Sequence, residues 1–290
     1  AVSSSYMFVI KLLSRLPFSI LYVISDLLFF FSFHVVKYRR KVVFQNLKNS
    51  FPEKSNAELR KIEKTFYINL CDYAVEMIKL LTISRDDLER RVKFVNPQIS
   101  INYIRRGQSL LNLASHQFNW EWLLAAGSFI LPGQMDFVYQ PVHNKFFNQF
   151  SLACRTRFGA YGIRRDSVAR EVIKRREIVR NIAIVGDQYP GWGHDKRYPA
   201  TFMHQPTVFF NGPNQLAILT QYPVLYYAMR KVKRGYYETT IVEIAMPPYE
   251  KENTDVLKKY IEEIEKVIHN DPAGWLWSHN RWKTRHLSNN

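Results

Sequence analysis

Short apolar segments alternate with longer amphipathic segments between residues 109 and 244, and this alternation limits the possible folds more than any other sequence feature. Residues 109–114 (SLLNLA) and 182–185 (IAIV) have the length and apolar content of buried strands. Because two parallel strands need a crossover connection, which is usually a helix, such alternation is typical of α/β proteins. The sequence therefore predicts an α/β fold with a mixed, largely parallel sheet flanked by helices.

The length of 290 residues suits one large α/β domain with an appendage, and no repeat or linker divides it. We expect an N-terminal membrane-anchoring helix within residues 1–38 and a single α/β domain in residues 39–290. Strands are predicted at 92–95, 109–114, 136–139, 160–163, 182–185, 223–229 and 236–244. Helices are predicted at 39–50, 57–81, 85–91, 101–106, 118–130, 145–158, 167–179, 212–221 and 254–269. Residues 188–206 are expected to form a loop, and a polar, basic tail is expected to close the chain.

Residues 18–36 form an apolar run of a length that just spans a bilayer. Asp26 and His34 interrupt it, and a carboxylate near the centre costs about 2.5–3.5 kcal/mol on insertion scales. Basic residues follow between positions 37 and 41, which favours that end on the cytoplasmic side. We therefore expect a helix that anchors in the membrane or lies on it. The alternative is an apolar helix packed on the core of the domain.

The chain carries a formal charge of +16, from 41 Lys and Arg against 25 Asp and Glu, and this excess requires an anionic partner. Nucleic acid, anionic lipid and an acidic carrier protein all qualify. The aromatic content of 15% favours a membrane interface, and no zinc-finger or RNA-recognition motif supports nucleic-acid binding. Cys71 and Cys154 are far apart in the sequence, as expected for free thiols in a reducing compartment.

The segment 114–122 (ASHQFNWEW) contains the candidate catalytic residues. His116 follows a predicted strand, and chemistry in open α/β sheets is usually done at that end of the strands. Glu121 lies five residues further on, so we expect its carboxylate to reach one imidazole nitrogen and leave the other as a general base. The alternative is a helix N-terminus capped by Ser115, with a carboxylate that follows by chance.

Further polar clusters occur in the same order as the predicted elements. Arg155 and Arg157 lie at the end of a predicted helix. Asp187 and Gln188 follow the most apolar strand, and the segment 275–283 (WLWSHNRWK) closes the domain.

Together these motifs resemble those of the bacterial lipid A late acyltransferases, a branch of the lysophospholipid acyltransferase superfamily. The resemblance covers nearly the whole chain. It implies that His116 is the general base, oriented by Glu121, and that Arg155 or Arg157 stabilises an anion or the developing oxyanion. It also assigns substrate binding to other matched positions, with Asp187 and Gln188 shaping the acceptor site and Arg281 and Lys283 binding lipid phosphate or carboxylate at the membrane face.

The chain departs from the family pattern after its Asp-Gln pair. The family often has two aromatic residues followed by Gly there, and this chain has Phe202, Met203 and His204. This loop lines the acyl or acceptor pocket in the family, so the acyl chain length and the acceptor stay open. His194 and His204 are not spaced like a metal-binding pair, and no metal site is expected.

The resemblance implies an O-acyltransferase that moves a fatty acyl chain from acyl-acyl carrier protein to a hydroxyl of a lipid A precursor. We expect direct transfer without a covalent acyl-enzyme and without a cofactor. The partners would be acyl carrier protein, an anionic glycolipid and the membrane, with no nucleic acid, at the cytoplasmic face of the bacterial inner membrane. Two alternatives are acylation of another head group, on an amino-acid or glycerol lipid, and a non-catalytic basic membrane-binding module.

Overall fold

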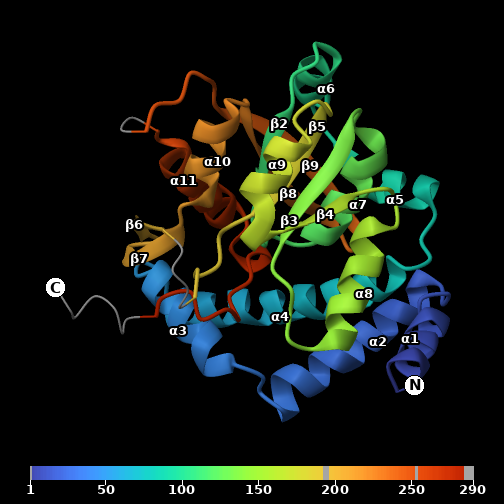
Figure 1. Ribbon diagram of the computed structural model, residues 1–290. Coiled ribbons are helices and arrows are strands. Elements are labelled where there is room, and N and C mark those ends of the chain that lie inside the picture. The colour runs from blue at the N-terminus through green and yellow to red at the C-terminus, as the bar shows by residue number, and fades with distance from the viewer. Residues whose placement is uncertain (1, 192–195, 252–253, 284–290) are drawn as a thin grey trace.

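The computed structural model describes residues 2–191, 196–251 and 254–283 (Figure 1). The helices are α1 (Val2–Leu13), α2 (Phe18–Phe29), the π-helix η1 (Phe30–Val35), α3 (Arg40–Ser50), α4 (Asn56–Lys79), α5 (Arg85–Arg91), α6 (Gln98–Arg105), α7 (Trp120–Ile130), α8 (Lys145–Thr156), the 3₁₀-helix η2 (Arg165–Ser167), α9 (Val168–Lys174), α10 (Gly212–Thr220), α11 (Val256–Asn270) and the 3₁₀-helix η3 (Pro272–Gly274). The strands are β1 (Val92–Phe94), β2 (Leu110–Ala114), β3 (Gln134–Tyr139), β4 (Tyr161–Arg164), β5 (Arg180–Val185), β6 (Arg197–Phe202), β7 (Gln205–Phe210), β8 (Val224–Lys233) and β9 (Tyr236–Ala245).

A seven-stranded sheet within the described residues forms the centre of the molecule, in the order β1-β9-β8-β2-β5-β3-β4. The five strands from β8 to β4 in this order are parallel to one another. β9 runs antiparallel to β8 and pairs in parallel with β1. The prediction of a mixed, largely parallel sheet is confirmed. β2 lies in the middle of this sheet, so the residues that follow it lie at the centre of its carboxyl edge.

Helices cover both faces of the sheet (Figure 1). α11 packs against β8 and β9 on one face, and α7 packs against β1 and β3 on the other. The side chains of β2 alternate between the two, with Leu111 and Leu113 in the core under α11 and Leu110 in the core under α7.

α4 packs against the loop that follows β2, next to α2 and α3 (Figure 1). A capping box defines its start: Ser55 Oγ accepts from the Glu58 amide, and the Glu58 carboxylate accepts from the Ser55 amide at 2.8 Å. Its carboxylates Glu63, Asp72 and Glu76 are all buried, so α4 carries charge into the layer between the sheet and the N-terminal helices.

The expectation of a loop over residues 188–206 is wrong for its described second half, because β6 and β7 form an antiparallel hairpin there. The turn residues Met203 and His204 both have positive φ, as two-residue hairpin turns require. Prolines at 199 and 206 argued against strands, although an isolated two-stranded edge tolerates them. His194 lies outside the described residues.

Residues 275–283 are mostly buried or half-buried, and the residues beyond 283, where the chain ends, lie outside the described part. Trp275 and Trp277 are 1% and 0% exposed, and Arg281 is 0% exposed. Aromatic rings of the hairpin and of this segment pack together, with Phe202 and Trp282 stacked at a centroid distance of 5.7 Å. The C-terminal segment is therefore part of the core.

Within the described residues, one helical segment, Phe18–Val35, has the length and composition to cross a membrane, and only 17% of it is buried. This is a weak indication of membrane association. The buried side of the segment is fixed to the body of the protein, because Ser25 Oγ donates to Asp72 at 2.7 Å and Asp26 pairs with Arg234 at 2.7 Å. The ion pair explains how a carboxylate occurs in an apolar run.

Candidate active site

His116 lies in the loop between β2 and α7, at the carboxyl edge of the sheet. Asn119 ends this loop and caps α7, because its side-chain oxygen accepts from the Trp122 amide at 2.9 Å. Phe118 has a φ of 50°, and its amide donates to the Gly274 carbonyl at 2.8 Å. The loop is therefore held between α7 on one side and η3 on the other.

Asp187, at the end of β5, is the carboxylate that orients His116. His116 Nδ1 lies 2.5 Å from Asp187 Oδ1, and the His116 amide donates to Oδ2 at 2.9 Å. Trp275 Nε1 donates to the same Oδ2 at 2.7 Å. Burial alone would raise the pKa of Asp187, but the neighbouring His116 and these hydrogen bonds hold it below its usual value. An ionised Asp187 keeps the proton on Nδ1 and leaves the lone pair on Nε2.

The expectation that Glu121 orients His116 is wrong. Both residues lie in the described part of the chain, and no hydrogen bond joins them there. The Trp120 ring packs edge-on against His116 at a centroid distance of 4.7 Å, and its Nε1 donates to Glu121 at 3.2 Å. Because α7 begins at Trp120, Glu121 in its first turn points toward α8 rather than back toward the loop.

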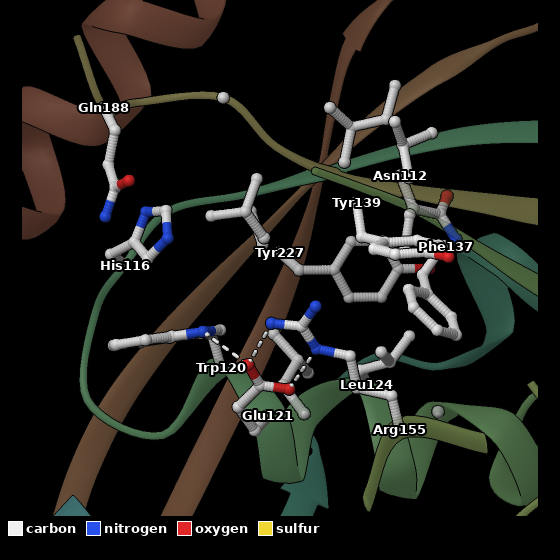
Figure 2. A pocket seen from close by; sticks show the side chains of 18 of the residues that line it. Asn112, His116, Trp120, Glu121, Leu124, Phe137, Tyr139, Arg155, Gln188 and Tyr227 are labelled. Carbon is white, nitrogen blue, oxygen red and sulfur yellow. Dashed lines mark hydrogen bonds and ion pairs between the residues drawn. The ribbon is translucent and has the colours of Figure 1, made fainter. Parts of the chain in front are cut away.

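Glu121 instead holds Arg155, the last arginine of α8. Arg155 Nε and Nη2 donate to the two carboxylate oxygens at 2.8 and 2.5 Å (Figure 2). Burial alone would lower the pKa of Arg155, but the Glu121 carboxylate raises it, so the guanidinium stays charged. Its third nitrogen, Nη1, has no hydrogen bond within the described residues and lies on the side away from Glu121 in Figure 2. The pair thus fixes a positive charge in place.

A pocket of about 310 Å³ joins these groups. His116, Gln188, Glu121 and Arg155 line its polar part (Figure 2). From there it runs between α7 and the sheet toward the amino ends of the strands. Most of the side chains that line this inner part are apolar: Phe94, Leu123, Leu124, Leu131, Met135 and Phe137.

Arg157 and Arg281 do not line this pocket, although both were candidates for anion binding. Arg157 Nη1 donates to the carbonyls of Leu80 and Ile83 at 3.0 and 2.5 Å, which ties α8 to the end of α4. Arg281 is fully buried and donates to Thr207 Oγ1 at 2.7 Å. Burial lowers its pKa to about 10. The expectation that Arg281 binds lipid phosphate at the membrane face is therefore wrong. Of the three candidate arginines, Arg155 lines the pocket, where Arg165 is a further lining residue.

Of the other two predicted binding residues, Gln188 lines the pocket and Lys283 does not. Gln188 lines the pocket beside His116, as Figure 2 shows. Lys283 is half-buried, and its ammonium lies 5.4 Å from the centre of the Tyr189 ring, which itself lines the pocket. Lys283 is thus next to the pocket wall rather than in it.

His279 has a role that the sequence did not indicate. Its Nε2 accepts from the Tyr189 amide at 3.0 Å, which holds the segment after Gln188. Burial, and to a smaller extent the neighbouring Arg281, lowers the pKa of His279 to about 4, so it stays neutral and can accept this hydrogen bond. Tyr189 and His279 are 90 positions apart, so no local spacing in the sequence could have revealed their contact. Only the family resemblance drew attention to the segment 275–283.

A comparison with protein families matches residues 1–284 to the bacterial lipid A biosynthesis acyltransferases. The chain belongs to this family. No curated protein matches the chain. The acyltransferase therefore carries a histidine–aspartate pair, a fixed arginine and an apolar pocket at one edge of its sheet. Within its described residues, no group of three His, Cys, Asp or Glu side chains is placed to hold a metal ion.

Proposed function

We propose that the protein transfers a fatty acyl chain from acyl-acyl carrier protein to a hydroxyl of a lipid A precursor. One observation carries the proposal: His116, polarised by Asp187, lies at the mouth of a deep pocket whose interior is apolar. A general base beside a hydrocarbon-sized channel suits the reaction of an acyl thioester with an alcohol.

In the proposed reaction, His116 Nε2 takes the proton of the acceptor hydroxyl as its oxygen attacks the thioester carbon. Asp187 stabilises the imidazolium that forms. Arg155 Nη1 stabilises the negative charge that develops on the carbonyl oxygen, and Glu121 holds Arg155 in position. The carbon–sulfur bond then breaks, and the proton on His116 passes to the departing thiolate. These steps need no cofactor or metal, because a thioester is already reactive toward an alkoxide.

We propose direct transfer, without an acyl-enzyme. Cys71 and Cys154 are buried, and burial raises the pKa of both thiols, that of Cys154 to about 12. A thiol that stays protonated is a poor nucleophile. Ser115 Oγ is buried and bonds to the Tyr226 hydroxyl at 2.9 Å rather than to the His116 imidazole.

The net charge of the chain supports the proposal of an acidic carrier protein and an anionic glycolipid as partners, and the N-terminal helices support attachment to a membrane. A surplus of 16 positive charges favours both an acidic carrier protein and an anionic glycolipid. α1, α2 and η1 expose large apolar side chains, among them Phe8, Val9, Leu12, Val23, Leu27, Phe30, Phe31 and Val35. We propose that residues 1–38 attach the enzyme to the cytoplasmic face of the bacterial inner membrane, where such lipids are available.

The experiment is an incubation of the purified protein with acyl-acyl carrier protein and a tetra-acylated lipid A precursor, followed by mass spectrometry of the lipid. We expect one added acyl mass, and no transfer when the acyl group is offered on coenzyme A at equal concentration. Transfer only to an amino-acid or glycerol lipid would keep the acyltransferase activity and replace the lipid A precursor as the proposed acceptor. No transfer to any lipid hydroxyl would contradict the proposal and favour a membrane-binding module.

A further inference from the structure

Glu76, in the last turn of α4, joins the catalytic loop to the N-terminal helices. The residue is 0% exposed. Its carboxylate accepts from Asn119 Nδ2 at 2.7 Å, from the Tyr22 hydroxyl of α2 at 2.9 Å and from the Tyr237 hydroxyl of β9 at 2.8 Å. Three elements that are far apart in the sequence therefore meet on one buried side chain.

The contact with Asn119 constrains the loop that carries His116. Because Asn119 Oδ1 is occupied by the Trp122 amide, its Nδ2 is the atom that must face Glu76. The Trp122 indole also donates to the Glu76 backbone carbonyl at 3.0 Å. α4 thus fixes both the last residue of the loop and the first turn of α7, which supplies Glu121.

Burial of this carboxylate is difficult to explain by stability alone. Glu63, in the same helix and equally buried, is paired with Arg40 and Arg60 at 3.1 and 2.8 Å. Glu76 has two phenols and one amide as partners, and burial raises its pKa to about 7. A buried acid without a cationic partner is costly, and apolar side chains of similar volume would fill the space at lower cost.

We propose that Glu76 is a positioning residue for acyl transfer, which fixes the His116 loop through Asn119 and couples it through Tyr22 to the membrane-facing helix α2. The expected effect on kcat rests on the proposed function, whereas the expected effect on the loop itself does not. When α2 is docked, Tyr22 and Asn119 share the carboxylate and the loop is held. When the Tyr22 contact is lost, the carboxylate has one partner fewer and the loop loosens.

The primary test is Glu76→Gln, measured with the full chain in lipid vesicles. Glutamine leaves a single acceptor oxygen, so its NH₂ group either faces the Asn119 NH₂ group or makes the hydroxyl of Tyr22 or Tyr237 turn and accept, and the present set of contacts is lost either way. We expect kcat to fall roughly tenfold or more, as for an unsatisfied buried polar group, with KM for the acyl donor nearly unchanged. Tyr22→Phe should lower kcat by a smaller factor.

A double variant separates positioning from loss of stability. In Glu76→Gln/Asn119→Asp, the glutamine NH₂ donates to the new aspartate, which reverses the hydrogen bond, and aspartate caps a helix as well as asparagine does. We expect this variant to recover most of the lost kcat. Glu63→Gln is the matched control, because it removes a buried carboxylate from the same helix, and it should lower thermal stability while kcat stays unchanged.

Hydrogen–deuterium exchange of the backbone amides in the segment 114–124 measures how firmly the loop is held, and it needs no catalytic turnover. We expect faster exchange in Glu76→Gln and Tyr22→Phe, but not in Glu63→Gln. The same kcat and exchange in Glu76→Gln as in the wild type would overturn the inference, and so would an equal effect of Glu63→Gln. If the wild type transfers no acyl group, the proposed function fails, and the exchange experiment still decides whether Glu76 holds the loop.

Discussion

At the scale of single residues, the partner of His116 determines how the imidazole acts. Asp187 contacts both Nδ1 and the backbone amide of His116, so it fixes the tautomer and the position of the ring together. Trp275, from the other end of the chain, completes the set of donors to Asp187. The proposed general base is thus built from three segments of the chain, none of which contains the whole arrangement.

Asp187→Asn tests this role. The amide removes the negative charge that stabilises the imidazolium, and it no longer selects the tautomer with the proton on Nδ1. We expect kcat to fall on the order of 10²–10⁴-fold, the range seen when a histidine base loses its carboxylate. Kinetics with varied acyl donor would measure it. A variant with wild-type kcat would exclude Asp187 as the orienting group.

The matched pair Arg155→Lys and Arg157→Lys tests which arginine acts. Lysine at 155 keeps the charge but cannot bind both oxygens of Glu121 and present a third nitrogen to the pocket. We expect Arg155→Lys to lower kcat by about 10²-fold, as for loss of one oxyanion donor. Arg157→Lys should change kcat little, because its contacts are backbone carbonyls outside the pocket. The reverse order of effects would contradict the assignment.

The sequence predicted the position of His116 well and its partner poorly, for a physical reason. A strand followed by a helix places His116 at the sheet edge, and this local pattern is visible in the sequence. The Asp187 contact joins residues 71 positions apart, so no local spacing reveals it. Glu121 has a suitable spacing, but the direction of its side chain depends on where α7 starts and on Arg155 across the pocket.

At the scale of elements, α7 and the sheet set the depth of the pocket. Gly127 lines its inner end. A Cβ there would lie 3.3 Å from Met135 Cε and 3.8 Å from Phe94 Cζ. Glu121 and Leu131 at the two ends of this wall are about 15 Å apart along the helix axis, at a rise of 1.5 Å per residue. A side chain larger than hydrogen at 127 would occupy the end of the pocket.

Gly127→Leu is expected to shift the products toward shorter acyl chains. The change also replaces glycine by a better helix former, a gain of up to about 1 kcal/mol that offsets part of the crowding. Competition between acyl donors of different length, with the products read by mass spectrometry, measures the shift. An unchanged chain-length profile in a folded variant would show that the acyl chain does not reach Gly127.

The elements themselves were largely predictable, because strands and helices of this fold have distinct apolar patterns. The hairpin of β6 and β7 was missed because its prolines and its turn, with Met203 and His204 at positive φ, follow no common turn sequence. The burial of Arg281 was not predicted, because its contact with Thr207 joins residues 74 positions apart.

At the scale of the whole molecule, an exposed apolar face lies over the N-terminal helices. Phe8, Val23 and Leu27 are 70%, 58% and 56% exposed. Replacing all three by serine should weaken vesicle binding at least tenfold, since each buried apolar side chain contributes about 1.5–3 kcal/mol. Cosedimentation with vesicles is the measurement. Ile173→Ser and Leu219→Ser, at exposed positions in α9 and α10, are the controls, and equal weakening by the controls would contradict a specific membrane face.

Stability should depend on pH through Glu76. Its pKa is raised from 4.5 to about 7 by burial, so the folded protein keeps this proton over a range in which the unfolded chain has lost it. The resulting stabilisation is complete below pH 4.5 and is lost as the pH rises through 7. In the wild type, the free energy of unfolding should fall by up to roughly 3 kcal/mol between pH 4.5 and pH 7 because of Glu76. We expect this fall to be absent in Glu76→Gln. Urea unfolding at several pH values measures it, and parallel curves for the two proteins would contradict the pKa shift.

The central claim is that His116 acts as the base for acyl transfer at the mouth of the apolar pocket. The most direct test is the single-turnover rate of transfer from acyl-acyl carrier protein to a lipid A precursor in wild type and His116→Ala. The account predicts that the variant binds the donor as the wild type does but transfers about 10²–10⁴-fold more slowly. Transfer at the wild-type rate by a folded His116→Ala protein would contradict it.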